Sequence, residues 1–158
     1  MPSVAQSANI NPDPMDEAFR QAEAAAARGE VPVGAVVVDV ATGAILAAAG
    51  NEVEKRADPT AHAEILVLRT AATAKGTPRL EDCDLYVTLE PCAMCAAAIS
   101  LARVRRLHFA AYDPKGGGVD HGPRFFAQST CHHRPEVIGG LQASRAEVLL
   151  KAFFAQLR

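Results

Sequence analysis

Aromatic residues are scarce in this sequence, which has no tryptophan, two tyrosines and six phenylalanines among 158 residues. It has no apolar run close to the roughly 20 residues that a membrane-spanning helix needs, so we expect no membrane association. Its opening residues lack the basic start and the apolar centre of a secretory signal peptide. We therefore expect a cytoplasmic protein, with a flexible tail at residues 1–12 and a single domain at residues 13–158.

Cysteine is also rare, with four residues in the chain. In the reducing cytoplasm, paired cysteines more often bind a metal or take part in catalysis than form a structural disulfide. The formal net charge of −2 combines an acidic region, residues 1–100, with a basic one, residues 101–158. The basic region suits contact with phosphate groups, although solvated surfaces often show a similar asymmetry.

Apolar periodicity and turn residues predict strands that alternate with helices. Asp13, Thr60 and Ser144 stand where helices should begin, and Glu147 would complete a capping box with Ser144. This order favours an α/β fold in which helices pack on both faces of a partly parallel sheet. The expected helices cover residues 14–28, 61–75, 92–102 and 144–158, and the expected strands cover 33–40, 44–50, 84–89, 105–111 and 135–140.

Two of the four cysteines lie in TLEPCAMCAAA, residues 88–98, where a strand-like run gives way to a helix-like one. Cys92 and Cys95 are three residues apart, so on the first turn of a helix their sulfurs project to the same side. The helix N-terminus favours thiolate over thiol there. The junction is therefore suited to binding a soft metal ion.

The segment HAE, which also follows a loop at the start of an expected helix, offers a third ligand. Helices that follow parallel strands begin at the same edge of a sheet, so His62 should face the two cysteines. Two thiolates and one imidazole leave one position of a tetrahedral zinc ion open, as in catalytic sites. Glu64 lies about 200° around a regular helix from His62, which makes it a poor ligand and a candidate proton carrier.

Two other interpretations of the cysteine pair stay open. A C-x-x-C pair also occurs in redox dithiols, although the intervening Ala-Met and the lack of tryptophan disfavour a thioredoxin-like site. In a closed structural zinc site, Cys131, His132 or His133 would supply the fourth ligand, but HAE would then have no role. We expect Cys83 to be a buried core thiol and His108, in a strand, to be a core or surface residue whose polar atoms are satisfied.

HAE followed by PCAMC resembles the zinc-deaminase signature H-x-E and P-C-x-x-C. Within that superfamily the chain is similar to the bacterial tRNA adenosine deaminases, which convert adenosine to inosine at the anticodon wobble position. The resemblance runs from about Asp16 to Arg158 and also rests on EVPVGAVVV, DPTAHAE, LYVTLEPCAMC, HRPEV and FFAQLR. It implies a cytidine-deaminase-like fold, a three-layer α/β/α sandwich with a mixed five-stranded sheet, one Zn²⁺ per subunit and a homodimer.

The resemblance also implies a role for each residue of the site. His62, Cys92 and Cys95 would hold zinc, and Glu64 would carry protons while hydroxide attacks C6 of adenine. The implied substrate contacts are Asn51, Val33, the backbone around Ala63, Asp113 and Phe154. Asn51, Val33, Asp113 and Phe154 each also have an ordinary structural explanation, as a strand, core or turn residue.

The implied partner is the anticodon loop of a tRNA, read as a single strand by stacking and by cationic groups near phosphates. The segment GGGVDHG, residues 116–122, together with Tyr112 and His132, departs from the family pattern in the expected RNA-contacting region. Two other functions stay open. One is deamination of a free nucleobase or nucleoside such as guanine or cytosine, and the other is a non-catalytic binding module stabilised by zinc.

Overall fold

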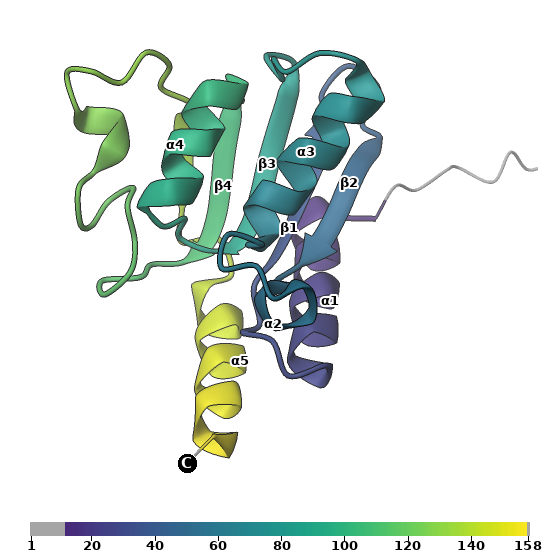
Figure 1. The fold of residues 1–158 in the computed structure, drawn as a ribbon, viewed down its shortest axis with the longest axis vertical. Coiled ribbons are helices and arrows are strands. Elements are labelled where there is room, and N and C mark those ends of the chain that lie inside the picture. The colour runs from purple at the N-terminus through teal and green to yellow at the C-terminus, as the bar shows by residue number, and fades with distance from the viewer. Residues whose placement is uncertain (1–11, 158) are drawn as a thin grey trace, which may run out of the picture.

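The computed structural model describes residues 12–157, which form a sheet with helices on both faces (Figure 1). The strands are β1 Gly34–Asp39, β2 Ile45–Gly50, β3 Cys83–Leu89, β4 Arg106–Ala111 and β5 Glu136–Gly139. Strand β1 pairs antiparallel with β2 and β3, whereas β3 with β4 and β4 with β5 pair in parallel. The order across the sheet is β2-β1-β3-β4-β5, which confirms the expected mixed five-stranded sheet.

Strand β1 shows why the sheet needs a helical layer on each face. The first five residues of β1 are all buried, a pattern typical of a strand that is covered on both sides. Successive side chains of a strand point to opposite faces. Val37 accordingly joins one hydrophobic cluster and Val36 joins the other, so the sheet separates two cores.

Helices α3, Ala63–Lys75, and α4, Ala93–Ala102, cover the face to which Val37 points (Figure 1). Val67 of α3 and Ile99 of α4 are at most 1% exposed and belong to the same cluster as the sheet residues. These two helices are the ones that carry HAE and the cysteine pair.

Helices α1, Pro14–Ala27, and α5, Ala143–Gln156, lie on the opposite face. The carboxylate of Asp13 accepts hydrogen bonds from two backbone N–H groups of the first turn of α1, so the predicted N-cap is confirmed. Phe19 of α1 is fully buried, and the guanidinium of Arg145 in α5 lies 4.2 Å from the centre of its ring. In Figure 1, α5 extends well beyond the edge of the sheet.

The directions of the strands decide where the site forms. Because β2 and β3 are both antiparallel to β1, they run in the same direction and end at the same edge. Helix α3 follows β2, and α4 follows β3, so both helices begin at that edge, as expected. Strand β1 lies between the two strands and separates the loops that lead into the helices.

Two predicted helix starts are wrong. Helix α3 has His62, not Thr60, as its N-cap, because Asp58 accepts both the backbone N–H and the hydroxyl of Thr60 in a tight turn. Helix α5 begins with Gln142 in the left-handed region as its N-cap, and no side chain caps it, so the capping box at Ser144 does not form. The local sequence is compatible with both predicted caps, but the preceding loops place other residues, His62 and Gln142, at the N-cap positions.

Helix α2, Val53–Arg56, was not predicted and occupies the loop between β2 and α3. None of the helices found between residues 12 and 157 is long and apolar enough to cross a membrane. Residues 1–11 of the expected tail lie outside the described residues.

Candidate metal centre and cavity

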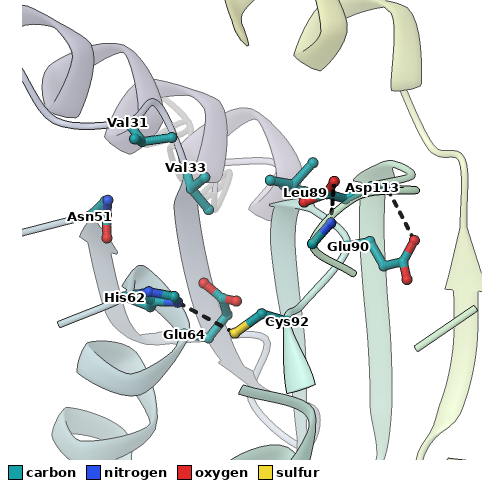
Figure 2. Close-up of a pocket in the computed structure, with 10 residues that line it drawn as sticks. Val31, Val33, Asn51, His62, Glu64, Leu89, Glu90, Cys92 and Asp113 are labelled. Carbon is teal, nitrogen blue, oxygen red and sulfur yellow. Dashed lines mark hydrogen bonds between the residues drawn. The ribbon is translucent and has the colours of Figure 1, made fainter. Parts of the chain in front are cut away.

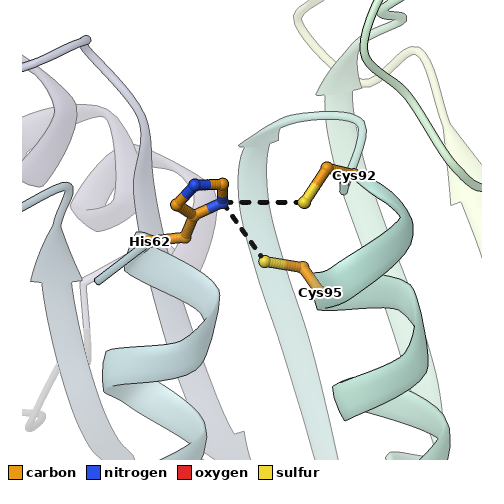
Figure 3. A group of neighbouring side chains, drawn as sticks. All are labelled: His62, Cys92 and Cys95. Atoms are coloured by element: carbon orange, nitrogen blue, oxygen red, sulfur yellow. Dashed lines mark hydrogen bonds between the residues drawn. The ribbon is translucent and has the colours of Figure 1, made fainter. Parts of the chain in front are cut away.

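His62, Cys92 and Cys95 meet where α3 and α4 begin (Figure 3). His62 and Cys92 are the N-cap residues of the two helices, and Cys95 lies one turn into α4. The Nδ1 atom of His62 is 3.6 Å from the Sγ atom of Cys92 and 3.5 Å from that of Cys95. Across the described part of the chain, this is the only group of three or more His, Cys, Asp or Glu side chains with donor atoms within 4.8 Å of one another.

These separations fit a zinc ion. Zn–S bonds of about 2.3 Å and a Zn–N bond of about 2.0 Å at a tetrahedral angle place nitrogen and sulfur about 3.5 Å apart. The two observed distances, 3.6 and 3.5 Å, agree with that value. Three protein donors leave the fourth position for water or substrate, which is the catalytic arrangement.

The three side chains are electrostatically coupled. The Cys95 thiol donates a hydrogen bond to Cys92, and with the His62 ring it lowers the pKa of Cys92 to about 4 despite partial burial. The same hydrogen bond and burial raise the pKa of Cys95. The hydrogen bond to Cys92 also raises the pKa of His62. The cluster thus places a thiolate, Cys92, beside two groups that retain protons, Cys95 and His62. A divalent cation bound between the three side chains would displace those protons.

Glu64 is 4% exposed and lines the same cavity as the metal donors (Figure 2). The 200° separation of a regular helix does not apply, because His62 lies before the first turn with an extended backbone, φ −71° and ψ 149°. Burial raises the pKa of the Glu64 carboxyl. A carboxyl shifted in this direction suits a group that accepts and returns protons near neutral pH.

The cavity beside the metal donors has a volume of about 290 Å³, close to the lower limit for small-molecule sites. Its walls come from both helix starts and from the loops after β2 and β4 (Figure 2). The predicted Val33, Asn51 and Asp113 all line it. The full lining is Val31, Val33, Asn51, His62, Glu64, Leu89, Glu90, Cys92, Asp113 and Gly116.

Asn51 brings an unsatisfied acceptor to this cavity. Its Oδ1 atom is buried and has no hydrogen-bond partner among residues 12–157. Its backbone is held firmly, since its N–H donates to the carbonyl of Val33 at 3.0 Å and its carbonyl accepts from Arg28 at 3.0 Å. A buried acceptor without a partner is costly, so Asn51 is placed to receive an N–H or O–H of a ligand.

Phe154 lines a second cavity, of about 470 Å³, that adjoins the first. The two cavities share Val31, Asn51 and His62 in their walls, so they lie side by side, and the second is also lined by residues at the end of α5. Ala63, by contrast, lines neither cavity, because its side chain is fully buried in the core beneath α3.

Two buried carboxylates that hold loops around the cavity carry no sign of that role in the sequence. Glu30 is 1% exposed and accepts from the backbone N–H groups of Glu54 at 2.7 Å and Lys55 at 3.4 Å. These hydrogen bonds hold α2, which lies in the chain between Asn51 and His62. Glu90 is 2% exposed and binds the loop after β4. Burial of a glutamate depends on distant segments, so residue type and spacing do not predict it.

The structure does not support a closed zinc site with residues near position 131. Cys131 donates to the carbonyl of His133 at 3.1 Å, and the His133 ring donates to the carbonyl of Val104 at 2.7 Å. Neither belongs to the metal-donor group. The expectation for Cys83 is confirmed, since it is fully buried and burial raises the pKa of its thiol to about 12. The expectation that His108 is satisfied is wrong, since its Nε2 atom is buried and has no hydrogen-bond partner among residues 12–157.

An α/β/α sandwich that offers one histidine and two cysteines at adjacent helix starts, beside a buried glutamate, defines the class of zinc-dependent deaminases. The family model of the cytidine and deoxycytidylate deaminase zinc-binding region matches residues 10–111. The chain belongs to this family, as a member similar to the tRNA-specific adenosine deaminases described next.

The tRNA-specific adenosine deaminase of Agrobacterium fabrum is 53% identical over 144 residues, which cover 91% of this chain and 93% of that protein. The Bacillus subtilis tRNA-specific adenosine deaminase is 44% identical, over 91% and 88% of the two chains. A solved structure from a study of A-to-I editing by tRNA:A34 deaminases has a TM-score of 0.84 and 53% identity, covering 87% of this chain and 98% of that one. A guanine deaminase structure from Nitrosomonas europaea has a TM-score of 0.78 and 25% identity, over 98% and 94%.

Proposed function

We propose that this chain deaminates adenosine to inosine at the wobble position of tRNA, in the cytoplasm. The observation that carries the proposal is the 53% identity with a tRNA-specific adenosine deaminase across 91% of the chain. The structure adds a metal-donor group, a buried glutamate and a cavity of suitable size at one edge of the sheet.

The chemistry is assigned to four side chains. His62, Cys92 and Cys95 hold Zn²⁺, one per subunit, and the bound ion supplies the Lewis acidity that makes hydroxide available near neutral pH. Glu64 takes the proton of the attacking water and returns protons to the ring nitrogen and to the leaving amine. A C–O bond forms at C6 of adenine, the exocyclic C–N bond breaks, and ammonia leaves.

The other predicted residues hold the nucleotide. The unpaired Oδ1 of Asn51 accepts a hydrogen bond from the base or its ribose, and Val33 packs against the base. Asp113, on the opposite wall, contacts the backbone beside the target nucleotide. Ala63 contributes through its backbone at the start of α3, since its side chain faces the core.

The second cavity favours a polynucleotide over a free base. It adjoins the first cavity and is lined by Phe154, a residue that is 46% exposed and offers a surface for stacking of a neighbouring base of the anticodon loop. An enclosed free base would leave this cavity unused.

A homodimer is part of the proposal. Leu101 of α4 is 78% exposed beside an open apolar depression of about 350 Å³ between α3 and α4. Ile65, Leu68 and Ala98 line the same depression, and exposed apolar surface of this kind often marks a protein–protein interface. Sedimentation equilibrium of the wild type and of Leu101→Asp tests it, since a dimer that this surface mediates should become monomeric.

A deaminase of a free base is the second candidate, because the structure of a guanine deaminase covers 98% of this chain with a TM-score of 0.78. The deciding experiment measures inosine in an anticodon stem-loop with adenosine at the wobble position. Parallel reactions contain adenosine, guanine and cytosine as free compounds. Turnover of the stem-loop alone supports the proposal, and turnover of the free compounds alone contradicts it.

A further inference from the structure

The loop that follows β4 is closed around one carboxylate. The Oε1 atom of Glu90 accepts from the backbone N–H of Asp113 at 3.0 Å and lies 2.7 Å from Nδ1 of His121. Its Oε2 atom accepts from the backbone N–H groups of Val119, Asp120 and His121 at 3.2, 3.0 and 3.2 Å. Glu90 thus ties the first residue of the loop to residues six to eight positions later.

The glycine at position 117 allows this closure. A Cβ atom there would lie 2.3 Å from Oε2 of Glu90 and 2.5 Å from the carbonyl oxygen of Asp113, so no larger residue fits. Glu90 is 2% exposed, and its two oxygens are satisfied by four backbone N–H groups and one imidazole. A buried carboxylate is tolerated only when it is paired in this way.

The same carboxylate connects the loop to the metal centre. Glu90 directly follows β3 and is joined through Pro91 to Cys92, and both Glu90 and Asp113 line the catalytic cavity (Figure 2). Asp113 is oriented within the loop, since its Oδ1 accepts from the backbone N–H groups of Lys115 and Gly116 at 3.2 and 3.0 Å. These contacts limit how far the Asp113 carboxylate can move relative to the zinc donors.

We propose that Glu90, supported by His121, is a positioning residue that sets the distance between the Asp113 carboxylate and the metal centre. It acts on the substrate through Asp113 and does not take part in proton transfer. The proposal rests on the proposed function, because Asp113 acts on the backbone beside the target nucleotide, which a free base lacks.

A double-mutant cycle tests it. In Glu90→Gln the carboxamide keeps one acceptor and places an NH₂ donor against backbone donors, so the loop should shift. We expect kcat/KM for the stem-loop to fall by about tenfold, mainly through KM, with unchanged zinc content. In an Asp113→Ala background the same substitution should change KM by less than about twofold. Equal losses in both backgrounds, or no loss in either, would overturn the proposal.

His121 provides the matched pair of variants. His121→Ala removes the side-chain donor to Glu90, whereas His121→Gln retains one, so His121→Gln should recover most of the KM that His121→Ala loses. Thermal melts establish that each variant is folded at the assay temperature. If Glu90→Gln does not fold, His121→Ala and His121→Gln are each combined with Asp113→Ala instead. Equal losses in KM in the wild-type and Asp113→Ala backgrounds would again overturn the proposal.

The failure of the proposed function gives a different result. If the wild type converts only a free base or nucleoside and does not turn over the stem-loop, the tRNA substrate is wrong and the positioning role on that substrate falls with it. If the wild type turns over the stem-loop, the absence of coupling between Glu90 and Asp113, including no effect of Asp113→Ala, contradicts the positioning role alone.

Discussion

The Nδ1 atom of His62 lies 3.5 Å from the Sγ atom of Cys95, although 33 residues separate them along the chain. The contact exists because β2 and β3 end at the same edge of the sheet, so that α3 and α4 begin side by side (Figure 3). Metal binding therefore depends on the whole sheet topology, and the free energy of metal binding contributes to the stability of the fold.

Removal of a metal ligand should affect both metal content and stability. Cys95→Ser replaces a buried thiolate with a weak zinc ligand, so we expect zinc content to fall from about one per subunit to a small fraction, with loss of activity. The melting temperature should fall to that of wild type treated with a chelator. Cys131→Ser is the matched control, since Cys131 is also buried but lies outside the donor group. Elemental analysis and thermal melts measure the two effects. Full zinc content in Cys95→Ser would contradict the assigned site.

Replacement of the buried glutamate should separate catalysis from metal binding. Glu64→Gln retains the shape of the side chain but no longer accepts a proton, so we expect kcat to fall by about 10²- to 10⁴-fold with zinc content unchanged. Glu81→Gln serves as control, because Glu81 is exposed in the loop before β3 and does not line the cavity. A protein that binds zinc and shows no activity even as wild type would instead be a non-catalytic binding module.

The unpaired acceptor of Asn51 predicts a loss of substrate affinity. In Asn51→Ala the cavity keeps its apolar wall but offers no carbonyl to the nucleotide, so kcat/KM should fall by about tenfold. Steady-state kinetics on the stem-loop measure this, and zinc analysis shows whether the metal centre is intact. A value within twofold of wild type would show that Asn51 is only a turn residue.

Phe154 should matter only for an extended substrate. Phe154→Ala removes a stacking surface in the second cavity, so KM for the stem-loop should rise by about tenfold. Turnover of any free nucleoside that the enzyme accepts should stay unchanged. Val148→Ala on the same helix is the control, since Val148 is 68% exposed and does not line the cavity. Equal effects on both substrates would point to a structural role for Phe154.

Because α1 packs closely on β1 at Gly34, we expect the stability of the fold to be sensitive to a single added methyl group there. A Cβ atom at Gly34 would lie 1.9 Å from the carbonyl oxygen of Ala18 and 2.6 Å from the backbone nitrogen of Ala22. Gly34→Ala should therefore lower the free energy of unfolding by about 1–3 kcal/mol, whereas Ala48→Ser on the exposed side of β2 should change it little. Chemical denaturation measures both. Wild-type stability in Gly34→Ala would contradict the packing of α1 on β1.

The sequence by itself determined the elements and the chemistry of the metal donors. Cys92 and Cys95 are predictable because a spacing of three on a helix start brings two sulfurs together by local geometry alone. The mixed five-stranded sheet was predictable from alternating periodicity together with the family resemblance. His62 followed from the rule that helices after strands of one direction begin at one edge.

Only the tertiary structure decided the remaining features of the site. The extended backbone at His62 brought Glu64 into the cavity, and Asp58 removed Thr60 from the expected cap. The roles of Glu30 and Glu90 depend on segments more than 20 residues away. The physical reason is the same in each case. Helical spacing and strand alternation are local properties of the chain, whereas burial of a polar group and its hydrogen-bond partners are set by how distant loops pack.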